Sequence, residues 1–441
     1  LRTILQQVRI QCVSNTIRVT PVRSLTLSIF FPSVIMTVGQ MALVIILPLY
    51  ILERGDGLAS AALIFAMRSL GSMVVNLPAS VAIARFGTRP VMLTGVAMIG
   101  AGALALSVAE TNLQIALATL IFGAGMGTWL LSRLSYITRH IAIQQRGKAM
   151  SVLAGIQRLG MLIGPLAGGL GVQAFGYEAV FVLIAACAVV SALPIWFFSE
   201  AAMDKDPTGR PALRPESELV AGPKPLTNLF TLVPKILYRH QKVFLSAGVF
   251  VFCLQFVREQ RRLLITLWGA SLGLDADAIG FAVSLTAIVD MLVFPVAGYL
   301  MDNKGRKVSG LSCILIMAVT LSLLALTGTY TTYVLVAVLT GVGNGLGSGI
   351  MLTLGSDFAP QHDSNQFLGV WRIFCDLGSL TGPLLTSIVS SLVIALNATA
   401  IVGMLGGLAL WLLVDETLPK KTSPKTASAK IQQAEPAPRD D

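Results

Sequence analysis

Long apolar stretches recur along almost the whole chain, and they constrain its fold more than any other feature. A bilayer core of roughly 30 Å needs about 20 apolar residues per helix, and twelve such stretches lie between Leu25 and Val414. Lipid cannot satisfy open backbone donors and acceptors, and the short alternating segments of barrel strands are missing, so each stretch is predicted to be a helix. The predicted spans are 25–51, 59–83, 88–109, 111–137, 149–173, 177–198, 243–268, 277–300, 308–327, 332–356, 366–391 and 397–414.

Composition and charge agree with a polytopic membrane protein. The 441 residues are 54% hydrophobic and 12% charged, with a mean hydropathy of +0.77, which excludes an ordinary soluble protein. Outside the spans, lysines and arginines gather in the N-terminal segment, the even-numbered loops and the C-terminal tail, whereas Arg54 stands alone in the odd-numbered loops. The positive-inside rule therefore places both termini in the cytoplasm. The net charge of +10 reflects this topology, and no nucleic-acid partner is inferred from it.

The chain divides into two related halves. Residues 199–242 contain six prolines and mixed charge, which predicts a linker. An offset of 218 residues aligns glycines and prolines of the two halves without a gap, which indicates parallel structural repeats of the kind that expose a midplane site alternately to each side. The matched positions are Gly87 with Gly305, Gly123 with Gly341, Gly125 with Gly343, Gly127 with Gly345, Gly160 with Gly378, Gly164 with Gly382 and Pro165 with Pro383.

The predicted organisation has five parts. A basic cytoplasmic N-terminal segment (1–24) is followed by the first six-helix bundle (25–198), the cytoplasmic linker (199–242), the second six-helix bundle (243–414) and a disordered cytoplasmic tail (415–441). The first 24 residues hold four arginines and no acid, a pattern also found in organelle transit peptides, and that alternative stays open.

Two motifs carry a family resemblance. The segment GYLMDNKGRK (298–307) and the segment GMLIGPLAGG (160–169) resemble signatures of the major facilitator superfamily, the second of them associated with its antiporters. The resemblance covers about 25–418 and points to the drug:proton antiporter-like subgroup. It implies an all-α membrane protein, with 12 transmembrane helices in two pseudo-symmetric six-helix bundles. The signature residues that it brings are Asp302, Gly305, Arg306, Lys307, Gly160, Gly164, Pro165, Gly168 and Gly169.

The physical roles of these motifs are readable from the residues. Gly305 permits a tight turn, and Asp302 can cap a helix or pair with Arg306 or Lys307. The glycines of the second motif recur every four residues, so they form a flat stripe on which a neighbouring backbone can pack closely.

The sequence also departs from the family pattern. Ala84 stands where the first-half loop is expected to have an acid, and Thr119 stands where helix 4 is expected to have a basic residue tied to proton coupling. The coupling ion is therefore left open by the motifs.

Seven arginines and three acids lie well inside the spans. Each would cost a few kcal/mol or more facing lipid, so they are expected to line the interior. We predict two pairs between the bundles, Arg68 with Asp376 and Arg158 with Asp290, and the local alternative is that Arg372 pairs with Asp376 one turn away. The ten residues are Arg68, Arg133, Arg158, Arg258, Arg261, Arg262, Arg372, Glu259, Asp290 and Asp376.

The segment VFCLQFVREQRRLL (251–264) interrupts a membrane span with charge. Gln255, Arg258 and Arg262 share one helical stripe, which predicts a cationic wall for an acidic group of the substrate. The alternative is that the arginines extend to lipid headgroups while Arg262 neutralises Glu259. The resulting candidates for substrate binding or coupling are Arg68, Arg158, Arg258, Glu259, Arg262, Asp290, Arg372 and Asp376.

These observations favour a secondary active transporter that works by alternating access and exports a small, drug-like organic compound in exchange for protons. Asp290 is the first choice for the proton carrier. The alternatives are uptake or facilitated exchange of an organic anion, and a membrane sensor or scaffold that does not transport.

No nucleophile, metal cluster or cofactor motif is recognised, so an enzyme is not expected. The expected partners are the small-molecule substrate, protons and the lipid bilayer, with the chain acting as a monomer. The expected location is a bacterial inner membrane, with an organelle membrane left open.

Overall fold

The computed structural model describes residues 25–141, 143–199, 227–360 and 364–418, and these ranges consist of helices joined by short turns. The first half contains the π-helical turn η2 (Thr26–Phe30) and helices α2 (Phe31–Glu53), α3 (Leu58–Phe86), α4 (Thr88–Ser107), α5 (Asn112–His140), α6 (Ile143–Phe175) and α7 (Tyr177–Phe198). The second half contains α9 (Thr227–Arg239), α10 (Gln241–Val243), the π-helical turn η3 (Phe244–Gly248), α11 (Val249–Ser271), α12 (Ala276–Asn303), α13 (Arg306–Leu324), α14 (Tyr330–Leu346), α15 (Ile350–Phe358), α16 (Ser364–Ile388) and α17 (Leu392–Leu413).

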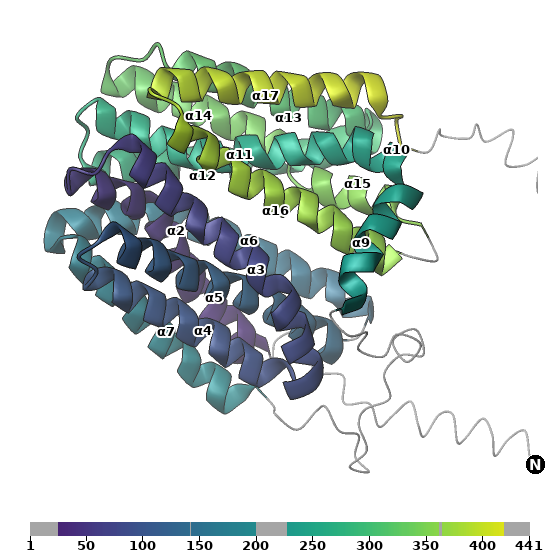
Figure 1. The fold of residues 1–441 in the computed structure, drawn as a ribbon, viewed down its shortest axis with the longest axis horizontal. Helices are drawn as coiled ribbons and strands as arrows, with labels where there is room; N and C mark the ends of the chain where they lie inside the picture. Colours follow the sequence, from purple (N-terminus) through teal and green to yellow (C-terminus); the bar gives the residue numbers. More distant parts are fainter. Residues whose placement is uncertain (1–24, 142, 200–226, 361–363, 419–441) are drawn as a thin grey trace, which may run out of the picture.

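The long helices form two groups that lie side by side (Figure 1). Helices α2 to α7 make the lower group and α11 to α17 the upper group, each around its own apolar core. Contact between the groups runs chiefly through α6 with α12 and α3 with α16. Two pairs of long helices therefore carry the interface.

Eleven helices in the described ranges are long and apolar enough to cross a membrane. The eleventh predicted span, 366–391, corresponds to α16, which has 25 residues but is not among the eleven helices counted here. Polar residues, among them Arg372 and Asp376, lower its hydropathy. The structure thus supports a helical membrane protein, while the membrane-crossing role of α16 stays a prediction.

The tenth predicted span, 332–356, is not one continuous helix. Helix α14 ends at Leu346, and α15 begins at Ile350 after Gly349, whose φ of +87° is a left-handed conformation that favours glycine. The break follows from the glycine-rich segment 341–349, which apolar character alone did not predict to interrupt the helix.

Parts of the predicted linker and tail are ordered helix or contact the core. Helix α9 lies in the predicted linker, and residues 415–418 of the predicted tail are described, with Glu416 contacting α13. Three predicted parts lie outside the described residues: the basic segment 1–24, linker residues 200–226 and tail residues 419–441.

Equivalent positions of the two halves make equivalent contacts. A Cβ at Gly123 would collide with the backbone carbonyl of Arg68, and a Cβ at Gly341 would collide with that of Thr286, which is 218 positions after Arg68. Close backbone packing at small residues is how helices associate where no water drives them together. The same correspondence relates Gly127 with Ser72 to Gly345 with Asp290, and the Thr111 capping box to the Thr329 capping box.

The glycine stripe of α6 packs as predicted. Gly160, Gly164 and Gly168 face Thr37, Met41 and Ala42 of α2, so close that a Cβ would clash or press on each neighbour. Another face of α6 meets the second half, because Gly169 abuts the Ala276 backbone and the Pro165 carbonyl abuts Gly280.

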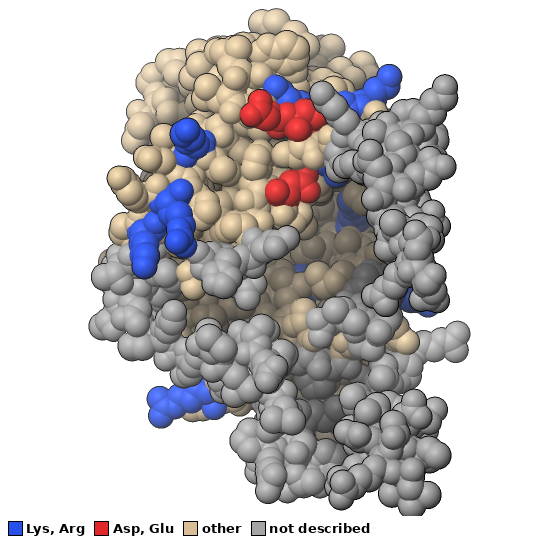
Figure 2. All heavy atoms as spheres, turned by 90° about the vertical axis from the view of Figure 1, so that its right-hand side faces the viewer, with Lys and Arg blue, Asp and Glu red and all other residues tan. Residues whose placement is uncertain are grey.

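The two groups of helices separate toward one end of the molecule. Gly169 and Ala276 bring the backbones of α6 and α12 together at the end where α12 begins. The opposite end, where α9 and α10 lie, shows a recess between the two groups (Figure 2).

We predict that Gly280→Val destabilises the protein by about 1–3 kcal/mol, because the new side chain overpacks against the Pro165 carbonyl across the interface. Gly298→Val on the same helix is the matched control, since a Cβ there meets nothing within 4 Å. Thermal unfolding of the purified proteins compares them. Equal melting temperatures of the two variants would contradict the assigned α6–α12 contact.

Candidate functional site

A buried ion triad joins the two halves. Arg68 of α3 donates from Nη2 to Glu259 Oε2 of α11 at 2.7 Å, and Arg262 donates from Nη1 to Glu259 Oε1 at the same distance. The side chains of Arg68 and Glu259 are only 8% and 5% exposed. At this depth an isolated charge is costly, so the three groups stabilise one another only while they stay together.

The predicted pair of Arg68 with Asp376 is therefore wrong. Glu259 accepts from Arg68 instead, while Asp376 pairs with Arg372 at 3.0 Å one turn away on its own helix. The local alternative thus describes Asp376 correctly, and Arg262 does neutralise Glu259 as the second alternative expected. Matching depths of two residues could not decide their pairing, because helix rotation determines which side chains face each other.

Asp376 and Arg158 occupy equivalent places in the two interfaces. Asp376 of α16 accepts from Asn76 Nδ2 of α3 at 2.9 Å. The Arg158 guanidinium of α6 lies 3.5 Å from the ring centroid of Phe294 on α12. Arg158 and Asp376 are 218 positions apart, as are Asn76 and Phe294, so both halves use the same position to reach across.

Asp290 lies near Arg158 but does not form the predicted ion pair with it. Asn344 Nδ2 of α14 donates to the Asp290 carboxylate. No described residue forms an ion pair with Asp290, although Arg158 and Arg261 are close enough to interact with it electrostatically. Asp290 is therefore the interior acid whose charge is not directly neutralised.

The predicted cationic wall on α11 is not assembled as one surface. Gln255 donates to Ser379 of α16, and Arg258 donates to the Gly347 carbonyl, which the break between α14 and α15 leaves free. Arg262 is held by Glu259. The arginine that lies beside Arg262 at the interface is Arg261, which was not chosen as a candidate.

A small cavity lies between the halves at this level. It has a volume of about 50 Å³ and is lined by Met41, Val44, Ile45, Met161 and Pro165 from the first half and by Arg261, Arg262, Ile265, Val283, Thr286, Ala287 and Asp290 from the second. The cavity therefore has apolar walls and a charged side formed by two arginines and one aspartate.

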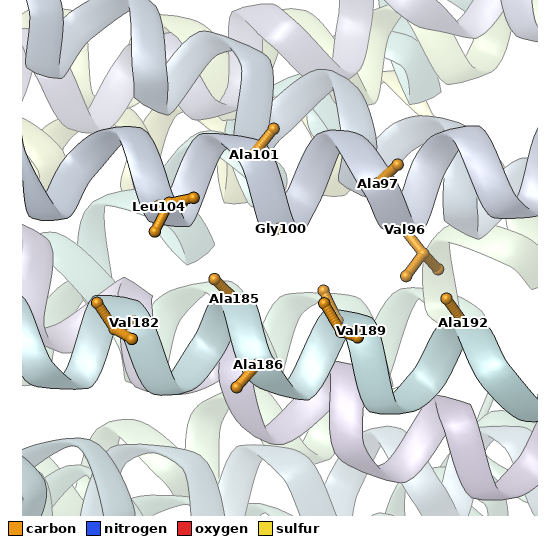
Figure 3. A pocket seen from close by; sticks show the side chains of 11 residues that line it. Val96, Ala97, Gly100, Ala101, Leu104, Val182, Ala185, Ala186, Val189 and Ala192 are labelled. Carbon is orange, nitrogen blue, oxygen red and sulfur yellow. The ribbon is translucent and has the colours of Figure 1, made fainter.

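A larger hollow of about 470 Å³ lies elsewhere, between α4 and α7 (Figure 3). Its lining is aliphatic, with Val96, Gly100 and Leu104 on one helix opposite Val182, Ala185 and Val189 on the other. It offers no polar group to orient a substrate, so the interface cavity is the better candidate site.

The signature turn between α12 and α13 is tied to the chain after α17. Gly305 has a φ of +107°, as the tight turn requires. Glu416 accepts from the backbone N–H groups of Arg306 and Lys307, and so caps the first turn of α13. Arg306 also bonds Asp357 at 3.2 Å, whereas its distance to the exposed Asp302 is 4.0 Å.

Glu416, Asp357 and Asn344 were missed as candidates. Glu416 belongs to the segment DETLP (415–419), which stood out only as a familiar ending, and its cap role depends on a turn 110 residues earlier. Asn344 was hidden in a glycine-rich segment. A polar residue inside an apolar span was the available signal for Asn344.

The fold and the charged interface define a multi-pass helical membrane protein of the transporter class. Residues 29–259 and 261–438 match the sequence model of the Major Facilitator Superfamily. The match covers most of the chain, so the protein belongs to this superfamily and is a transporter of that type.

Similar proteins include the Staphyloferrin B transporter of Staphylococcus aureus (strain NCTC 8325 / PS 47), which is 33% identical over 113 residues, or 26% of this chain and 27% of that protein. The MFS-type transporter TwmF of Talaromyces wortmannii is 30% identical over 123 residues, or 28% of this chain and 22% of that protein. Each alignment thus spans about a quarter of the relative's length.

Solved structures share the fold at low sequence identity. A POT family transporter in complex with thioalcohol conjugated peptide superposes with a TM-score of 0.70 at 14% identity, covering 88% of this chain and 95% of that one. A POT family transporter in complex with 5-aminolevulinic acid gives the same score and identity, covering 88% and 96%. This likeness concerns the fold alone.

We predict that Glu259→Gln destabilises the protein by about 3–5 kcal/mol, because it leaves the buried Arg68 guanidinium without its counter-charge. Asp302→Asn is the matched control, since that exposed carboxylate lies 4.0 Å from Arg306 and its loss costs roughly 0–1 kcal/mol. Thermal unfolding of both variants, and of Arg68→Met with Glu259→Gln, measures the coupling. A double variant no more stable than Glu259→Gln would argue against the pair.

We predict that Glu416→Ala lowers stability by about 0.5–1 kcal/mol at pH 7, a small value for a lost cap because the carboxylate is exposed. Burial raises the pKa of Glu416, but the backbone N–H groups of Arg306, Leu418, Lys307 and Thr417 outweigh it, so the pKa lies below its ordinary value. The wild-type advantage is therefore complete above the pKa of an unfolded glutamate, about 4.3, and is lost as the pH falls through the folded pKa. Melting temperatures of both proteins across this range test the sign.

Proposed function

We propose that the protein is a secondary active transporter that works by alternating access and exports a small organic compound in exchange for protons. The observation that carries this proposal is the buried ion pair between Arg68 of α3 and Glu259 of α11, which joins the halves at the interface. If the halves rock about the interface cavity, this pair must break and its charges must find other partners. A protein that only anchored itself in the membrane would not need an ion pair that is so costly to bury between its halves.

Asp290 is our candidate for the proton-carrying group. Glu259 is paired with two arginines, and Asp376 is paired with Arg372 and accepts from Asn76, so a proton on either carboxylate would disrupt an ion pair. Asp290 lines the interface cavity, and within the described ranges the Asn344 amide is the one side chain that donates a hydrogen bond to it. It can therefore exchange a proton without breaking an ion pair.

A second candidate function is uptake or facilitated exchange of an organic anion. The interior charge around the interface favours it, because Arg68, Arg158, Arg261 and Arg262 outnumber Glu259 and Asp290. In both versions we place the protein as a monomer in a bacterial inner membrane with cytoplasmic termini. A sensor or scaffold would bind its ligand without flux.

We predict that Asp290→Asn abolishes the dependence of transport on a pH gradient while counterflow continues. The expected loss of gradient-driven flux is about tenfold, as a coupling of 1–3 kcal/mol implies. The measurement uses proteoliposomes with an imposed gradient, with tetraphenylphosphonium as the cationic probe and benzoate as the anionic probe.

Asp275→Asn serves as the control, because Asp275 is exposed in the turn before α12 and does not line the cavity. Gradient-dependent flux that persists in Asp290→Asn would rule out Asp290 as the coupling group. Wild-type benzoate flux that ignores the gradient would replace export by facilitated exchange, and binding without flux of any probe would replace transport by sensing.

A further inference from the structure

Arg261 is a buried arginine that forms no direct ion pair with a described residue. Arg261 is 9% exposed, and no carboxylate among the described residues forms an ion pair with it. Among the described residues, its guanidinium donates one hydrogen bond, from Nη1 to the Thr340 hydroxyl at 3.4 Å, and its Nε has no partner. Holding a guanidinium in this state is expensive, so a missing partner is implied.

The position of Arg261 indicates where that partner binds. Arg261 and Arg262 border the same interface cavity, together with Asp290. The cavity of about 50 Å³ exceeds the roughly 10–15 Å³ that one water needs, so it has room for a small polar group such as a carboxylate. Its remaining walls come from both halves and are apolar, with Met41, Ile45 and Met161 among them.

We propose that this cavity is an anion subsite in which Arg261 and Arg262 bind the carboxylate of a small amphipathic organic acid. This inference rests on the proposed transport function and names the substrate class of its site. A planar guanidinium matches a carboxylate through two parallel hydrogen bonds, and such charge-assisted bonds strengthen where water is excluded. The apolar part of the ligand contacts the methionine and isoleucine walls.

The local charges select against other ligands. The triad of Arg68, Glu259 and Arg262 carries one net positive charge, and Arg158, Arg261 and Asp290 carry another. A cation would meet this excess, and a neutral ligand would leave Arg261 unpaired. Asp290 is the negatively charged residue of the cavity lining, so it weakens the binding of an anion. Neutralising Asp290 should therefore strengthen anion binding.

The test compares three ligands of one shape on the purified full-length protein: benzoate, its neutral analogue benzamide and its cationic analogue benzamidinium. Isothermal titration is expected to show benzoate as the preferred ligand. Arg261→Gln is expected to weaken benzoate binding about tenfold, because it removes a charged hydrogen-bond donor to the carboxylate. Asp290→Asn is expected to increase the affinity for benzoate severalfold.

Arg85→Gln is the control, because Arg85 is an exposed arginine at the end of α3, away from the cavity, and its benzoate affinity should equal that of the wild type. Arg261→Gln is expected to weaken benzoate binding and Asp290→Asn to strengthen it. A loss of folding would weaken binding in both variants, so it cannot produce this pair of results. Benzamide or benzamidinium binding as tightly as benzoate overturns the inference, and so does weaker benzoate binding in Asp290→Asn. Binding is measured without a gradient, so this outcome leaves the transport experiment to judge the proposed function separately.

Discussion

Burying arginines in a membrane-spanning bundle requires counter-charges, and this requirement organises the interface between the two halves. Arg68 is buried on α3, and its counter-charge is a carboxylate on another helix, Glu259 of α11. Glu259 in turn holds Arg262, so one carboxylate serves two cations. Since removing any member leaves an uncompensated charge in a low-dielectric interior, the triad stabilises the conformation in which α3 and α11 face each other.

The surrounding packing is consistent with two halves that move relative to each other. Within the first half, glycines of α6 let it lie directly against α2, which makes a firm contact over several turns. Between the halves, the same helix meets α12 through close backbone contact at Gly169 and Gly280. An interface of this kind combines a narrow packed contact with a few polar links: the triad, Asn76 with Asp376, and Arg158 over Phe294.

The repeat also shows where the halves have diverged. Each half places a basic side chain over a tryptophan at the turn end, Arg89 over Trp196 and Lys307 over Trp411, with the basic group also donating to the tryptophan carbonyl. Only the second half has an acid in the turn, because Ala84 replaces it in the first. The charged cluster of α11 has no counterpart in α2, where Gln40 to Ile46 are uncharged, so the candidate site is an addition to one half.

The sequence determined which segments are helices, how the halves correspond and where backbones pack closely, because these depend on local apolar length and on glycine spacing. The turn at Gly305 and the stripe at Gly160, Gly164 and Gly168 followed from the same local rules. The tertiary structure alone decided the partners of the charged side chains. Arg68 and Glu259 are 191 positions apart, and their pairing depends on the rotation and depth of two helices in different halves. The hydrophobic pattern does not specify that rotation, because these helices have apolar groups on most of their sides. For the same reason only the folded structure showed that Arg261 lines the interface cavity beside Arg262 and Asp290.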